Sequence, residues 1–69
     1  MSEKLFNNDD ITRIFETATF GVVAECNQTC MQFRYDSLTK LYSDAFDLQQ
    51  KGYIVMPKND NMSLTITPV

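Results

Sequence analysis

The sequence predicts a single small α+β domain, in which one four-stranded antiparallel sheet carries a central helix on one face. Two observations support this fold class. Apolar residues recur at helical spacing in two segments, and each of these segments is followed by two short β-prone stretches joined by turn residues. The predicted order is α-β-β-α-β-β. With 69 residues the chain is one domain, residues 1–6 are expected to form a flexible tail, and the strand order is left open.

The first helix is predicted from about Asp9 to Thr19. Asn7 suits the N-cap, because its side-chain oxygen can accept an orphan backbone N–H, and Asp10 stands at the capping-box position. Gly21 is a natural stop for the helix. One apolar stripe follows the helical period: Ile11, Ile14, Phe15 and Ala18.

A hairpin is predicted next, with a loop of either two or four residues within 27–30. One face of it would be mostly apolar: Val22, Ala24, Cys26, Met31, Phe33 and Tyr35. The other face would be mostly polar: Val23, Glu25, Gln32 and Arg34.

The second helix has clear boundaries. Asp36 is predicted to cap it, Ser37 to open it, and Gly52 to close it. Its apolar stripe comprises Leu38, Leu41, Tyr42, Ala45 and Leu48, widened by Phe46. Its solvent-facing side would carry Lys40, Ser43, Asp44, Asp47, Gln50 and Lys51.

The second hairpin contains a mismatch that bears on function. Residues 53–56 are apolar at every position, whereas residues 62–67 alternate between apolar and polar. A strand that is apolar on both faces is usually covered on both. The first helix either joins the second helix or covers the second face, where Ile54 and Met56 would lie opposite Thr65 and Ser63. If that face is open, it is expected to meet another molecule.

The residue types argue against catalysis and against bound metals or cofactors. The chain has no His, which removes the commonest general base and the usual catalytic triads. Cys26 and Cys30 are too few for a zinc site, so we interpret Cys26 as a core residue and Cys30 as a free thiol. The acidic pairs Asp9–Asp10 and Asp44–Asp47 are interpreted as solvated helix faces. Two glycines cannot build a phosphate-binding loop.

Charge and hydropathy argue against two further classes of partner. A net charge of −3, with scattered bases, disfavours nucleic acid and anionic membranes. Neither a membrane-spanning stretch nor a signal peptide is recognisable, so a cytoplasmic protein is expected. Five aromatic residues that could stack on bases are instead assigned to the core: Phe33, Tyr35, Tyr42, Phe46 and Tyr53.

These patterns predict a small acidic, non-enzymatic protein-binding module that docks on a larger protein as a regulator or inhibitor. The expected partner-binding residues are Val23, Arg34, Ile54 and Met56. Virus-encoded inhibitors of host enzymes include compact acidic proteins with this order of elements, which is an analogy at the level of fold alone. The alternative is a homodimer that uses the same face as its seam, with or without a small ligand bound there.

Overall fold

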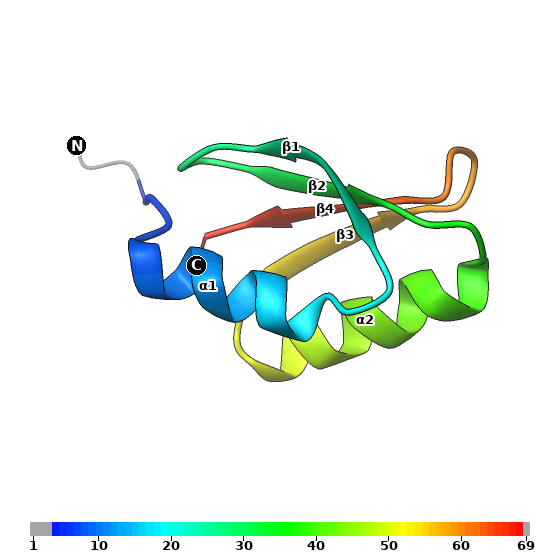
Figure 1. Ribbon diagram of the computed structural model, residues 1–69, viewed down its shortest axis with the longest axis horizontal. Coiled ribbons are helices and arrows are strands. Elements are labelled where there is room, and N and C mark those ends of the chain that lie inside the picture. The colour runs from blue at the N-terminus through cyan, green and yellow to red at the C-terminus, as the bar shows by residue number, and fades with distance from the viewer. Residues whose placement is uncertain (1–3, 69) are drawn as a thin grey trace.

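The computed structural model describes residues 4–68 and has two layers, a sheet and a pair of helices that lie on the same side of it (Figure 1). The elements in chain order are α1 (Asn8–Thr17), β1 (Val22–Cys26), β2 (Met31–Arg34), α2 (Leu38–Gln50), β3 (Ile54–Lys58) and β4 (Ser63–Thr67). The predicted α+β class and the predicted order of elements are therefore confirmed.

The four strands form one antiparallel sheet in the order β1-β2-β4-β3, so that β1 and β3 are its two edges. In the second hairpin Pro57 lies opposite Leu64, and Lys58 lies opposite Ser63. The loop therefore covers residues 59–62, whereas the turn-forming residues Lys58, Asn59, Asp60 and Asn61 predicted a loop over 58–61. This moves the pairing by two residues, and because side chains alternate along a strand, every predicted facing is kept.

The core lies between the sheet and the helices. Its buried apolar residues come from α1, β2, α2 and β4 and from the segments that adjoin them: Phe6, Ile14, Ala18, Met31, Phe33, Tyr35, Leu41, Ala45, Leu48, Tyr53, Leu64 and Ile66. Phe6 is buried and its backbone N–H bonds to Gln28, so the predicted tail of residues 1–6 does not extend to Phe6, and residues 1–3 of that prediction lie outside the described residues. Val55 of β3 packs against this core from the edge. A single chain thus encloses its own apolar centre.

Helix α1 begins as predicted but ends earlier. Asn7 accepts a hydrogen bond from the backbone N–H of Asp10, and the Asp10 carboxylate accepts one in return from the backbone N–H of Asn7. The helix ends at Thr17, with Ala18 as its C-cap. Gly21 therefore does not stop the helix. A Cβ atom on Gly21 would lie 2.6 Å from Cζ of Tyr35, so the absent side chain makes room for that ring.

Helix α2 has Ser37 as its N-cap instead of Asp36, since the Ser37 hydroxyl accepts a hydrogen bond from the backbone N–H of Lys40. Asp36 forms an ion pair with Lys40. Gly52 ends the helix as predicted, with a φ of 97° that favours glycine.

Candidate functional site

The outer face of the sheet is left open by both helices. Helix α1 packs beside α2 and does not cross to the other side (Figure 1). Of the two positions that the sequence left open for the first helix, the structure shows the one that exposes this face. Ile54 is 49% exposed there and Met56 is 55% exposed. Arg34 is exposed on the same face, in the middle of the sheet.

Val23 was predicted to join these residues, and the structure places it elsewhere. A β-bulge between Val23 and Glu25 shifts the register of β1, so that Val22 lies opposite Arg34 and Val23 lies opposite Phe33. Because opposite residues of an antiparallel pair share a face, Val23 belongs to the helix side of the sheet and Val22 to the outer face. The prediction for Val23 failed because a bulge has no clear signature in the sequence.

One flank of α2 adds apolar residues that the sequence had assigned to the core. Tyr42 and Phe46 are exposed, the latter by 61%, and Leu38 is 40% exposed. These three residues are spaced four apart and so form one line along the helix. The Tyr42 hydroxyl donates a hydrogen bond to the side-chain oxygen of Asn59, directly after β3. That bond places the line on the β3 side of the helix.

Exposed apolar side chains thus lie on both sides of β3, with Leu38, Tyr42 and Phe46 on α2 and Ile54 and Met56 on the outer face of the sheet. We call these five residues the β3-side surface. Single exposed apolar residues are common, whereas several around one edge mark a binding site. The sequence contained a signal for its helical half, because Leu38, Tyr42 and Phe46 lie at i, i+4 and i+8.

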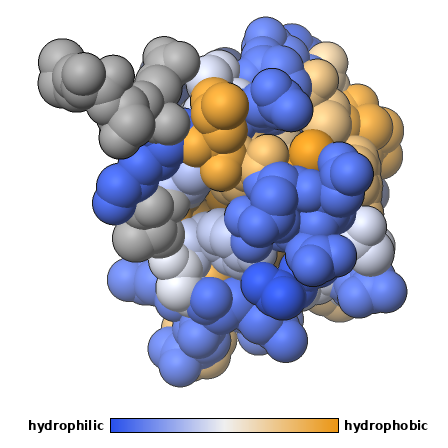
Figure 2. All heavy atoms as spheres, turned by 90° about the vertical axis from the view of Figure 1, so that its left-hand side faces the viewer, coloured by the Kyte–Doolittle hydropathy of each residue, from blue (hydrophilic) through white to orange (hydrophobic). Residues whose placement is uncertain are grey.

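The end of the molecule where α1 begins looks different. Figure 2 shows mainly hydrophilic side chains there, with hydrophobic ones reaching the surface along the upper right of the view. Exposed apolar residues of the β1 side include Phe20, Val22 and Val23. Val22 and Val23 belong to the strand that the bulge distorts and point to opposite faces of the sheet, with Glu25 on the same outer face as Val22. On the other side, β3 pairs with β4 without a shift of register.

The most unusual group in the fold is Asp44, which the helical pattern had predicted on the solvent-facing side of α2. Its side chain is fully buried. Its Oδ2 atom accepts hydrogen bonds from the backbone N–H groups of Phe20 and Gly21, at 3.1 and 3.2 Å, and from the Tyr35 hydroxyl at 2.8 Å. Among residues 4–68 its Oδ1 atom has no hydrogen-bond partner.

The Asp44 cluster, comprising Asp44, Tyr35, Phe20 and Gly21, ties the chain between α1 and β1 to α2. Burial, together with the hydrogen bond to Asp44, raises the pKa of Tyr35 well above its usual value. Phe20 and Tyr35 line a small pocket together with Val22, Arg34 and Asp36, whereas Asp44 itself is fully buried and does not line it. We therefore assign the Asp44 cluster to holding the fold. A sequence signal did exist, since Asp44 stands next to Ala45 and between Leu41 and Leu48 on the helix.

A second polar cluster joins α1 to the start of β3. The Tyr53 hydroxyl donates a hydrogen bond to Asp10 at 2.8 Å and accepts one from Arg13 at 3.2 Å. Arg13 and Asp10 also form an ion pair, with 3.5 Å between nitrogen and oxygen. Burial, followed by the bond to Asp10, raises the pKa of Tyr53. Its partners are all engaged with one another, which indicates a structural role.

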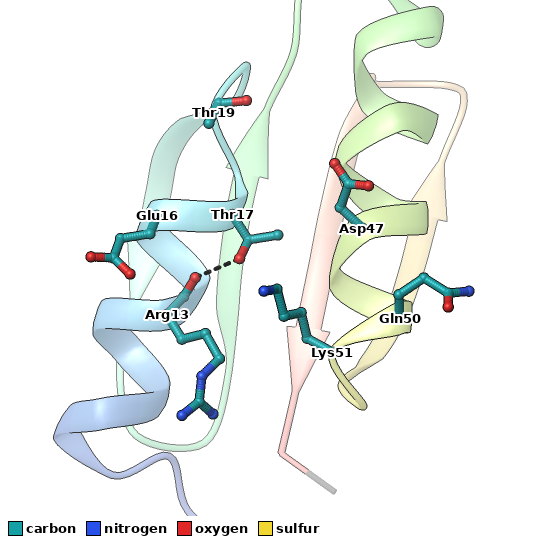
Figure 3. A pocket seen from close by; sticks show the side chains of 7 residues that line it. All are labelled: Arg13, Glu16, Thr17, Thr19, Asp47, Gln50 and Lys51. Atoms are coloured by element: carbon teal, nitrogen blue, oxygen red, sulfur yellow. Dashed lines mark hydrogen bonds between the residues drawn. The ribbon is translucent and has the colours of Figure 1, made fainter.

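A groove of about 500 Å³ separates the two helices (Figure 3). Its lining residues are Arg13, Glu16, Thr17, Thr19, Asp47, Gln50 and Lys51. Lys51 reaches across toward α1, whereas Glu16 points away from the groove. The lining carries two bases and two acids and is largely open to solvent. Such a groove favours no charge of ligand, and it contains no buried polar group that would hold one.

Within the part of the chain that the structure describes, no group of three or more His, Cys, Asp or Glu side chains is placed to hold a metal ion. Cys26 and Cys30 are both free. Cys26 is exposed on β1, which corrects its assignment to the core, because the helices do not reach far enough to cover that edge strand. None of the helices within residues 4–68 is long and apolar enough to cross a membrane.

Comparisons with protein-family models, with curated proteins and with solved structures gave no match to this chain.

Proposed function

We propose that this protein is a small acidic, non-enzymatic protein-binding module, which regulates or inhibits a larger protein by docking through the β3-side surface. The observation that carries the proposal is the exposure of five large apolar side chains around one sheet edge. We place the protein in the cytoplasm, and the free thiols of Cys26 and Cys30 support a reducing compartment.

The residue types of the surface suit a protein interface. Tyr, Phe and Met are enriched at the centres of such interfaces, where they combine large contact areas with adaptable packing. Tyr42 is held by Asn59, so that little side-chain freedom remains to be lost when a partner binds. Two of the aromatic residues that the sequence assigned to the core, Tyr42 and Phe46, thus supply two of the five residues of the proposed contact.

The edge itself is poorly suited to pairing with another strand. Pro57 has no backbone N–H to donate, and Lys58 follows it, two devices that protect edge strands from uncontrolled pairing. We therefore infer that the partner contacts the side chains above and below β3 more than its backbone.

A second copy of this chain is the competing occupant of the surface. Small domains often dimerise to complete a core that one chain lacks. Here the core is enclosed by one chain, with residues such as Phe33, Leu41 and Ile66 buried. This removes the main physical reason for a homodimer and favours a different protein as the partner.

The test begins with the mass of the purified protein in solution, measured by light scattering across a wide concentration range. We expect a monomer. Proteins captured from cells with the wild-type chain are then purified and titrated by calorimetry. The variant Ile54→Asp/Met56→Asp is expected to weaken binding at least about a hundredfold, since it places two charges in a desolvated contact.

The matched control is Leu5→Asp, which also replaces an exposed apolar side chain by a charge, since Leu5 is 48% exposed. Leu5 lies next to Phe6, whose backbone N–H bonds to Gln28 in the turn between β1 and β2, away from β3 and from Arg34. The control variant should leave the affinity within about twofold. Phe46→Ser tests the helical half of the surface and should weaken binding as well. A stable dimer, or an affinity that survives both Ile54→Asp/Met56→Asp and Phe46→Ser, contradicts the proposal.

A further inference from the structure

The outer face of the sheet differs in charge from the rest of the molecule. The whole chain carries nine acids and six bases. The register places two bases on the outer face, Arg34 and Lys58, and one acid, Glu25. Among residues 4–68, neither Arg34 nor Lys58 takes part in an ion pair. An acidic protein therefore presents two available cations on its open face.

These cations lie in one row across the sheet. Arg34 on β2 lies opposite Ser63 on β4, and Ser63 lies opposite Lys58 on β3. Neighbouring strands are about 4.8 Å apart, so the two basic residues stand about 10 Å apart at the backbone, with a serine between them. Ser63 itself is fully buried and its hydroxyl bonds to Asn61, so a bound carboxylate would be held by the two long basic side chains and not by the serine.

The same row adjoins the apolar part of the face. Met56 precedes Lys58 by two residues on β3, and Ile54 precedes Met56 by two, so all three side chains point to the outer face. Met56 and Lys58 are therefore about 7 Å apart along the strand. A partner seated on Ile54 and Met56 would bring its next side chain over the basic row.

We propose that the partner segment which docks here is acidic, with apolar side chains against Ile54 and Met56 and a carboxylate against Arg34 and Lys58. This deepens the proposed function and rests on it. The pairing places opposite charges beside an apolar contact, which fixes the register of the bound segment and speeds its association.

Single-stranded nucleic acid is the other class of anionic polymer that could meet two cations on a sheet. Sheets that bind it present aromatic side chains on which bases stack. The outer-face positions of the paired residues hold no aromatic residue: Val22, Glu25, Gln32, Arg34, Ile54, Met56, Lys58, Ser63, Thr65 and Thr67. The acidic peptide fits this face better.

The experiment selects short random peptides displayed on phage against the immobilised wild-type protein. A selected peptide is then synthesised with a fluorescent label, and its affinity is measured by anisotropy. We expect enrichment of peptides that combine Asp or Glu with aliphatic or aromatic residues. Arg34→Glu/Lys58→Glu should weaken the peptide about tenfold or more at low salt, and by less at high salt.

The matched control is Lys4→Glu/Lys51→Glu, which changes the net charge equally at sites away from the outer face. It should keep the affinity within about twofold. A peptide whose acidic residues are replaced by Lys should bind the Arg34→Glu/Lys58→Glu variant more tightly than it binds the wild-type protein. That swap would be the strongest support for the pairing of charges.

Three results overturn the inference. The first is that the selected peptides lack acidic residues, and the second is that Arg34→Glu/Lys58→Glu and Lys4→Glu/Lys51→Glu lose peptide affinity equally. The third is that a mixed-sequence oligonucleotide binds more tightly than the peptide and competes with it at Arg34 and Lys58. The proposed function fails separately. If Ile54→Asp/Met56→Asp leaves the selected peptides bound, the surface is wrong. If it abolishes binding while Arg34→Glu/Lys58→Glu does not, only the acidic partner is wrong.

Discussion

The two flanks of α2 reverse the usual distribution of polar and apolar residues. On the flank turned to the chain between α1 and β1, the acid Asp44 is fully buried. On the flank turned to β3, Tyr42 and Phe46 are exposed. The difference comes from what lies against each flank, because α1 and the segment after it cover one of them and the described chain covers the other only in part.

This comparison shows that an unexpected side chain has a different meaning on each side. A buried carboxylate costs several kcal/mol unless donors surround it. The Oδ2 atom of Asp44 meets that condition with three donors, whereas Oδ1 has no partner among residues 4–68, and we assign the residue to stability on the three bonds to Oδ2. Exposed aromatic residues lose the benefit of burial, and they regain it only when a partner covers them. Mutations on the two flanks should therefore separate stability from binding.

The largest effect is expected for Asp44→Ala. It leaves the N–H groups of Phe20 and Gly21 and the Tyr35 hydroxyl without their acceptor, which should cost about 3 kcal/mol of unfolding free energy. Urea unfolding followed by circular dichroism measures it. A loss below about 1 kcal/mol would show that the cluster contributes little. In a double-mutant cycle, the losses of unfolding free energy caused by Asp44→Ala and by Tyr35→Phe should be clearly non-additive.

Gly21→Ala is expected to cost about 2 kcal/mol, since the new Cβ would lie 2.6 Å from the Tyr35 ring inside the same cluster. Gly52→Ala is the matched control. Nothing lies within 4 Å of its added Cβ, and its cost of about 1 kcal/mol comes from the positive φ alone. Equal melting temperatures for the two variants would argue against crowding at Gly21.

Alkaline pH should lower the free energy of unfolding through Tyr35, a member of the Asp44 cluster. The folded pKa of Tyr35 is raised, so its contribution is complete below the unfolded pKa of about 10 and is lost as the pH rises above it. The unfolded chain ionises first, and stability should fall by about 1.4 kcal/mol per pH unit for each tyrosine that stays protonated in the fold. Urea midpoints from about pH 8 to pH 11 test this. A flat profile would contradict the burial of Tyr35.

The smallest effect on stability is expected on the β3 flank. Phe46→Ser should change the unfolding free energy by no more than about 0.5 kcal/mol, because its side chain is 61% exposed. The same variant is expected to lose partner binding. Urea unfolding compared with calorimetric affinity checks both expectations. If Phe46→Ser destabilises the fold as strongly as Asp44→Ala, the two flanks do not differ as described.

Much of the local structure could be predicted from residue patterns. The capping box of Asn7 and Asp10, the stop at Gly52 and the facing of the second hairpin follow from chemistry within a few residues. The bulge at Val23 could not be predicted, because it depends on how β1 bends against its neighbour. The four expected binding residues thus divide, with Ile54, Met56 and Arg34 on the outer face and Val23 on the other.

The sequence by itself determined the α+β class, the element order and the apolar character of residues 53–56. These depend on periodicity and turn chemistry, which act over short distances along the chain. Only the tertiary structure decided that both helices share one face, that Asp44 is buried, and that Tyr42 and Phe46 are exposed. A helical period shows which residues share a flank of α2, but only the position of α1 determines which flank is removed from water.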